Sequence, residues 1–153
     1  MVRQLQPFHT NLKKRLVKSP KIYLYDSGLL HSLLGITDYK MLLGHPASGS
    51  SWEGWVIEQI LNMLPTYWRT YFYRTSSGAE LDLVIQPAAG KPLIAVEIKF
   101  SLEPCLTKGF WSAFADLNPA AGFVVYPGSE AYPLANNVIA LPAAEITKIV
   151  SAV

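Results

Sequence analysis

The chain has 153 residues, half of them apolar and 16% charged, which is enough apolar material for one well-packed domain and excludes a disordered protein. The formal net charge is only +2, but every charged residue before Asp26 is basic. Positive charge is therefore concentrated at the N-terminal end.

The first predicted elements are extended chain and a short helix. Residues 1–18 are expected to be irregular or extended, and residues 21–25 form a short strand. Asp26 or Ser27 then caps a helical stretch that ends at Gly35.

A longer helix is predicted after a loop over residues 44–49. The run Ser50-Ser51-Trp52-Glu53 matches a capping box, in which a serine oxygen accepts from the first turn and Glu53 reaches back. The helix runs to about Leu64 and stops at Pro65.

The remaining predicted elements are strands and helices. Three strands come first, over residues 68–75, 80–85 and 93–100, joined by a tight turn at Ser76-Ser77-Gly78 and a turn-rich connector. They are followed by a helix over residues 106–117, strands over residues 122–126 and 138–141, and a terminal helix over residues 143–150. Consecutive strands favour an antiparallel meander, whereas the helix that follows favours a parallel neighbour. The predicted fold is α/β, with a mixed central sheet flanked by helices.

The cysteine content and the hydropathy indicate a cellular compartment. The single cysteine, Cys105, cannot form an intrachain disulfide and cannot alone anchor a zinc site. No apolar run approaches membrane-spanning length, and the N-terminus lacks the layout of a signal peptide. We therefore expect a reduced, cytoplasmic protein without a membrane partner.

Two of the predicted strands carry acidic side chains in an alternating pattern. Successive side chains of a strand point to opposite faces, so Glu97 and Lys99 share one face, and Asp82 shares a face with Glu80. If the strands pair, Asp82, Glu97 and Lys99 converge on one patch. Two carboxylates and an ammonium held in this way suit a divalent cation and an activated water. Glu80 lies nearer the start of its strand and is expected at the rim.

Helical geometry ranks the two acids of the long helix. At 100° per residue, Glu53 lies on the apolar face that is directed toward the sheet, whereas Glu58 is expected to be solvated. An acid on a buried face is costly unless it is paired or coordinates an ion. Glu53 is therefore the third member of the predicted acidic group.

Helical Glu53, Asp82 and Glu97-Ile98-Lys99 resemble the signature of PD-(D/E)XK nucleases, although Leu81 stands where the signature has Pro. The predicted element order resembles the αβββαβ core of restriction-endonuclease-like folds. Longer strings resemble the C-terminal domain, of unassigned function, of a prokaryotic AAA+-type ATPase family. These strings are residues 11–29, Trp52-Glu-Gly-Trp-Val56, residues 73–82 and Glu97-Ile-Lys99.

The resemblance implies a division of the chain and a partner. Residues 1–45 would be a basic segment that contains the tail of a winged-helix region and a short helix, and residues 46–153 would be the nuclease-like domain. The chain has no phosphate-binding loop of the Gly-x-x-x-x-Gly-Lys-[Ser/Thr] type, so it contains no ATP site. An ATPase module would therefore act in cis or in trans.

The resemblance also implies a metal-dependent DNA endonuclease. Asp82 and Glu97, with the carbonyl of Ile98 and with Glu53, would bind Mg²⁺ or Mn²⁺, and Lys99 would orient or deprotonate the attacking water. Basic residues that could contact DNA phosphates are Lys13, Lys14, Arg15, Lys18, Arg74 and Lys108.

Other hypotheses remain open at the level of sequence. The domain could be catalytically silent and bind DNA or a partner protein for an ATPase, since folds do not determine activity. A Glu-x-Lys pair on a strand is also a common cross-strand charge pair. The sequence does not distinguish DNA from RNA as a substrate, and it leaves a homodimer open.

Overall fold

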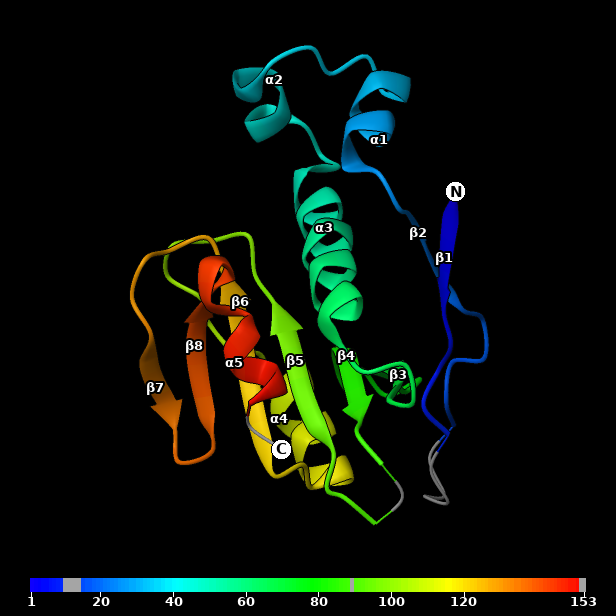
Figure 1. Cartoon of the computed structure of the whole chain (residues 1–153), viewed down its shortest axis with the longest axis vertical. Coiled ribbons are helices and arrows are strands. Elements are labelled where there is room, and N and C mark those ends of the chain that lie inside the picture. The colour runs from blue at the N-terminus through cyan, green and yellow to red at the C-terminus, as the bar shows by residue number, and fades with distance from the viewer. Residues whose placement is uncertain (10–14, 89, 152–153) are drawn as a thin grey trace.

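Figure 1 shows the computed structural model, which describes residues 1–9, 15–88 and 90–151. Its centre is a six-stranded sheet in the order β3-β4-β5-β6-β8-β7. The strands are β3 (Arg69–Arg74), β4 (Glu80–Gln86), β5 (Ile94–Ile98), β6 (Ala121–Tyr126), β7 (Tyr132–Ala135) and β8 (Val138–Pro142). Strands β3, β4 and β5 form an antiparallel meander, β5, β6 and β8 are parallel, and β7 is antiparallel to β8.

Helices cover both faces of this sheet. On one face α3 (Ser48–Met63) and α5 (Thr147–Val150) pack on a core cluster with β4, β5, β6 and β8, and on the other α4 (Lys108–Leu117) packs on a second cluster. A 3₁₀ turn, η1 (Ala143–Glu145), precedes α5. The predicted α/β class, the mixed sheet and the order helix, three strands, helix, strand are confirmed.

The predicted start of the long helix is wrong. Helix α3 begins at Ser48 rather than Ser51, and its N-cap residue Ala47 makes no side-chain capping bond. Ser51 lies inside the helix and is buried, and its hydroxyl lies 2.6 Å from Nε2 of His31. The contact of this serine with His31 of α1 (Ser27–Leu33) therefore replaces the capping box that the local sequence suggested.

The N-terminal residues form a separate two-stranded sheet. Strand β1 (Val2–Leu5), in a segment predicted to be irregular or extended, pairs antiparallel with β2 (Lys21–Leu24). Of the two predicted caps, Asp26 rather than Ser27 caps the following helix α1 (Ser27–Leu33), by accepting a hydrogen bond from the Leu29 amide. Helix α2 (Tyr39–Gly44) and strand β7 were not predicted. Helices α1 and α2 lie beyond the N-terminal end of α3, away from the sheet (Figure 1).

The chain on either side of residues 10–14 lies along the edge strand β3. The amide of Phe8 donates to the carbonyl of Phe72, and the amide of Val17 donates to the carbonyl of Arg74. Farther along, the amide of Ser76 donates to the carbonyl of Arg15. These bonds pair backbone groups that an edge strand would otherwise leave open.

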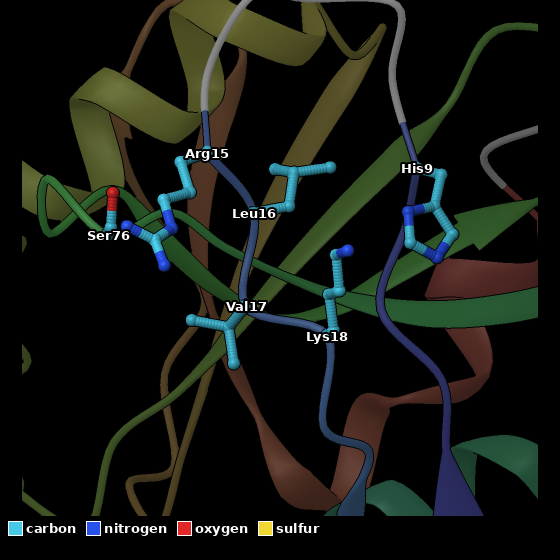
Figure 2. Close-up of a pocket in the computed structure, with 6 residues that line it drawn as sticks. All are labelled: His9, Arg15, Leu16, Val17, Lys18 and Ser76. Atoms are coloured by element: carbon cyan, nitrogen blue, oxygen red, sulfur yellow. The ribbon is translucent and has the colours of Figure 1, made fainter.

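A cavity of about 730 Å³ lies where this chain meets the turn after β3 (Figure 2). Arg15 and Ser76 lie on one side of the cavity and His9 lies on the other, with Lys18 between them. The basic side chains of Arg15 and Lys18 are exposed here. This surface, defined by Arg15 and Lys18, is called the basic cavity below.

Strand β4 contains a bulge beside the acidic residues. Tyr71 pairs with Val84 and Tyr73 pairs with Leu81, so two residues of β4, Asp82 and Leu83, lie opposite the single residue Phe72. An extra residue of this kind interrupts the alternation of side chains and re-aims them. As a result Leu81 and Val84 belong to the same core cluster, although a regular strand would place them on opposite faces.

Two glycines in helical first turns provide a matched test of packing in this fold. A Cβ added at Gly109 of α4 would overlap the carbonyl oxygen of Gly78, whereas a Cβ at Gly49 of α3 meets no atom within 4 Å. We expect Gly109→Ala to lower the free energy of unfolding by about 1–3 kcal/mol. Gly49→Ala should raise it by up to about 1 kcal/mol, because alanine loses less backbone entropy in a helix. Urea denaturation measures both, and equal effects would contradict the close approach of α4 to the Gly78 turn.

Candidate functional site

The candidate site is an acidic cavity of about 280 Å³ at the ends of β4 and β5. Regular pairing of these strands runs from Ile85 opposite Ile94 to Leu83 opposite Val96. The charged side chains of the two strands lie past the Leu83–Val96 pair, where the regular pairing has ended. The charged residues that line the cavity are Glu53, Glu80, Asp82, Glu97 and Lys99, and it is also lined by Gly78, Ile98, Thr107 and Gly109. The structure thus brings all four predicted catalytic residues, Glu53, Asp82, Glu97 and Lys99, to one cavity.

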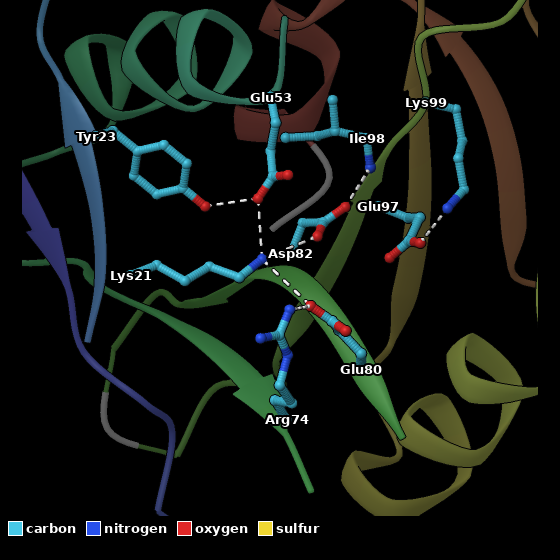
Figure 3. Close-up of polar contacts among 9 residues, drawn as sticks. All are labelled: Lys21, Tyr23, Glu53, Arg74, Glu80, Asp82, Glu97, Ile98 and Lys99. Atoms are coloured by element: carbon cyan, nitrogen blue, oxygen red, sulfur yellow. Dashed lines mark hydrogen bonds and ion pairs between the residues drawn. The ribbon is translucent and has the colours of Figure 1, made fainter. Parts of the chain in front are cut away.

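Asp82 is held from two sides (Figure 3). The residue is 8% exposed. Its Oδ2 accepts a hydrogen bond of 2.9 Å from the backbone amide of Ile98, and its Oδ1 accepts one of 3.1 Å from Nζ of Lys21. Burial, followed by repulsion from Glu53, raises the pKa of Asp82, although Lys21 and the Ile98 amide act in the opposite direction.

Glu97 has one oxygen that is paired and one that is not. The residue is 5% exposed, and its Oε1 accepts a hydrogen bond of 2.6 Å from Nζ of Lys99. Its buried Oε2 has no hydrogen-bond partner among the described residues. Burial and the charge of Asp82 raise the pKa of Glu97 to about 7. A buried acceptor without a donor is unfavourable, so this oxygen is a natural point of contact for a cation.

A residue that the sequence analysis did not assign to the site, Lys21, lies among its acids. Lys21 Nζ lies 2.9 Å from Glu53 Oε1 and 3.4 Å from Glu80 Oε1, in addition to its bond to Asp82. Tyr23 donates a hydrogen bond of 2.6 Å to Glu53 Oε1. Burial lowers the pKa of Lys21, but Asp82 and Glu53 outweigh this effect, so that the pKa is raised overall. One signal in the sequence could have paired Lys21 with Tyr23: residues two apart on a strand direct their side chains to the same face.

The expectation that Glu58 is solvated is wrong. Glu58 is only 4% exposed, and its carboxylate accepts two hydrogen bonds, of 2.8 and 2.9 Å, from the guanidinium of Arg3 on β1. The helical-wheel argument placed Glu58 away from the sheet but could not include the N-terminal strands, which cover that side of α3. Glu58 is therefore a structural anchor for β1, outside the acidic cavity.

The predicted phosphate contacts are dispersed. Arg74 forms an ion pair with Glu80, which in turn contacts Lys21, so the Arg74 guanidinium is already engaged. Arg15 and Lys18 lie in the basic cavity, and Lys108 is exposed at the start of α4. Lys13 and Lys14 lie outside the described residues.

The donor set suits a cation held by two carboxylates better than one held by three. In the part of the chain that the structure describes, no group of three or more His, Cys, Asp or Glu residues is arranged to hold a metal ion. Asp82 and Glu97 nevertheless offer the oxygen ligands that Mg²⁺ and Mn²⁺ prefer, and Mg²⁺ is often bound by one or two carboxylates together with substrate phosphates. Glu53 is instead engaged by Lys21 and Tyr23.

Sequence comparison places most of this chain in a family. Residues 48–146 match the family described as Domain of unknown function (DUF4143). The chain belongs to this family. It is a domain family found in AAA-ATPase-associated proteins. Residues 1–40 match a second family, Domain of unknown function (DUF8612). Lys21 therefore lies in the region matched by this second family, whereas the acids of the cavity lie in the region matched by DUF4143.

Two curated mycobacterial proteins are similar to this DUF4143 chain. Uncharacterized protein Rv2008c of Mycobacterium tuberculosis and uncharacterized protein Mb2031c of Mycobacterium bovis are each 44% identical to it over 146 residues. The aligned region covers 95% of this chain but 32% of either relative, so the chain spans about one third of their length. No solved structure gave a significant match. Within the described residues, no helix has the length and apolar character needed to cross a lipid bilayer.

The raised pKa of Glu97 predicts a pH-dependent stability in the absence of metal. Because the folded-state pKa, about 7, lies above the ordinary value of 4.5, the protonated form is favoured in the folded state. The stabilising contribution of protonated Glu97 is therefore fully present below pH 4.5 and is lost as the pH rises through 7. We expect Glu97→Gln to reduce the fall in unfolding free energy between pH 5 and pH 8 by an amount of the order of a few kcal/mol.

Urea denaturation in EDTA at several pH values measures this effect. Glu103→Gln, at an exposed acid outside the cavity, is the matched control and should retain the profile of the unmodified chain. Identical pH profiles for Glu97→Gln and the unmodified chain would contradict the assignment.

Proposed function

We propose that this chain is a nuclease domain that cleaves DNA phosphodiester bonds with the help of a divalent cation. The observation that supports the proposal best is the arrangement of Asp82, Glu97 and Lys99 around one cavity, where the buried Oε2 of Glu97 has no donor among the described residues. This cluster combines two carboxylates that can bind a cation with an ammonium that can contact a phosphate. The resemblance to the PD-(D/E)XK signature points to the same chemistry.

Asp82 and Glu97 would hold the ion, together with the main-chain carbonyl of Ile98. When bound, such an ion supplies Lewis acidity toward a phosphodiester. The bonds from the Ile98 amide to Asp82 Oδ2 and from Lys21 to Asp82 Oδ1 fix the orientation of this carboxylate, and the bond from Lys99 fixes that of Glu97. The two carboxylates are therefore positioned in advance, which limits the reorganisation needed on binding.

Lys99 has a role defined by its partner. Burial lowers the pKa of Lys99, but the hydrogen bond and charge of Glu97 outweigh this effect and raise the pKa overall. The side chain is thus an ammonium at neutral pH. It is suited to contact a phosphate oxygen and to hold Glu97, rather than to remove a proton from water.

The basic cavity provides a place for the nucleic-acid backbone. Arg15 and Lys18 are exposed and lie beside the turn at Ser76, and the acidic cavity includes Gly78 of the same turn. Basic side chains of this kind contact phosphates and position DNA without reading its sequence. We also propose that the domain works within a longer protein with an ATPase module, because its relatives are about three times as long and its family is found in ATPase-associated proteins.

Supercoiled-plasmid nicking in Mg²⁺ or Mn²⁺ tests cleavage. Asp82→Asn removes a charged ligand and Lys99→Met removes the ammonium, and each should lower the nicking rate about 100-fold or more. Glu145→Gln, which removes an acid that pairs with Lys148 outside the cavity, is the matched control and should retain the unmodified rate. Nicking that survives both cavity substitutions would contradict the proposal.

A second candidate function is a silent module that holds DNA. The engagement of Glu53 by Lys21 favours this candidate, because it withdraws one acid from the predicted ligand set. The silent module would be supported if the unmodified chain binds DNA without nicking it and Asp82→Asn binds DNA with the same affinity.

DNA binding is tested by its dependence on salt. Replacing Arg15 and Lys18 by Gln removes two phosphate contacts, so the slope of log affinity against log salt should decrease in magnitude by about two. A variant with Gln at Lys40 and Lys91, exposed bases outside both cavities, has the same change in net charge and should retain the slope. Equal slopes in the two variants would contradict the role of the basic cavity.

A further inference from the structure

The ammonium of Lys21 lies among carboxylates that could otherwise be ligands of a metal cation. It contacts Glu53 at 2.9 Å, Asp82 at 3.1 Å and Glu80 at 3.4 Å, and its side chain is only 15% exposed (Figure 3). These contacts lie on the side of Asp82 opposite the Ile98 amide, at the oxygen Oδ1. A second cation that approached this oxygen would meet the charge of Lys21.

Lys21 belongs to the N-terminal strands and not to the domain that contains the acids. Lys21 lies on β2, which pairs with β1, and β1 is anchored to α3 through Arg3 and Glu58. Tyr23, also on β2, packs so closely on α3 that a Cβ added at Gly54 would lie 3.1 Å from its ring. The anchor, the packing and the hydrogen bond from Tyr23 to Glu53 together hold β2 against the site.

We propose that Lys21 is a built-in counter-cation that competes with a divalent cation for Asp82 and Glu53. This inference rests on the proposed function, since it concerns the same carboxylates. The N-terminal strands then set the cation affinity of the cavity. With Lys21 in place the cavity offers Asp82 and Glu97, and with Lys21 withdrawn Glu53 and the second side of Asp82 become available. The domain would bind its cation most tightly when β2 moves away from α3.

Two charges of the same sign repel strongly at a partly buried site, so removing Lys21 should strengthen cation binding. A purely structural role predicts a different result. In that case the loss of Lys21 would lower stability and would leave cation affinity unchanged or weaker. Cation affinity therefore separates the two roles.

Titration of the whole chain with Mn²⁺, followed by the electron paramagnetic resonance signal of the free ion, measures this affinity. We expect Lys21→Met to bind Mn²⁺ about tenfold or more tightly than the unmodified chain. Lys21→Arg disturbs the same packing but keeps the charge, so its affinity should remain near that of the unmodified chain. Arg3→Met loosens β1 without removing the Lys21 charge and should give a smaller increase than Lys21→Met.

The outcomes separate this inference from the proposed nuclease activity. Equal affinities in Lys21→Met and Lys21→Arg would overturn the competition and leave the cation site in place. No Mn²⁺ binding by any of these proteins would overturn both. Tight binding by Lys21→Met without plasmid nicking would support the competition and overturn cleavage.

A measurement on the unmodified chain covers the case in which Lys21→Met does not fold. Nitrogen-15 resonances of lysine ammonium groups report on their ion pairs, and Lys21→Arg identifies the signal of Lys21. Addition of diamagnetic Mg²⁺ should shift this signal as the contacts to Asp82 and Glu53 are broken. A Lys21 signal that does not change while Mg²⁺ binds would overturn the inference.

Discussion

Two nearly buried carboxylates at the end of the central sheet require compensation, and much of the surrounding structure provides it. Asp82 receives a backbone amide from β5 and an ammonium from β2, and Glu97 receives the ammonium of Lys99. Isolated buried charges are costly, so each of these donors contributes to the fold as well as to the site. The N-terminal strands therefore supply part of the charge balance of the domain that they cover.

The geometry of the sheet explains why these groups meet. The bulge in β4 interrupts the alternation at Asp82, and regular pairing with β5 runs only as far as Val96. The Asp82 carboxylate then bonds to the Ile98 amide as a neighbouring strand would. Bulges of this kind are common beside functional sites because they re-aim one side chain while the rest of the ladder stays intact.

Local patterns were sufficient for five of the six strands of the central sheet, all except β7, and for the acids on it. The alternation of side chains in two strands predicted that Asp82, Glu97 and Lys99 share a site. The helical wheel added Glu53, which does line the cavity. The same wheel failed for Glu58, because its partner Arg3 is 55 residues away in the chain. Lys21 was missed for a similar reason. Contacts between distant segments depend on tertiary packing, which neither periodicity nor capping preferences encode, and the misplaced start of α3 has the same origin.

The pairing of the N-terminal chain with β3 has a consequence for solubility. Phe8 and Val17 bond to the backbone of β3, and at the other edge of the sheet β7 carries Pro133, which has no amide to donate. Both edges are thus blunted against recruitment of strands from other molecules. A version trimmed to the residues after α2 would uncover β3 and acquire a surface prone to self-association. The N-terminal segment therefore protects the edge of the sheet against aggregation, in addition to its packing role in the fold.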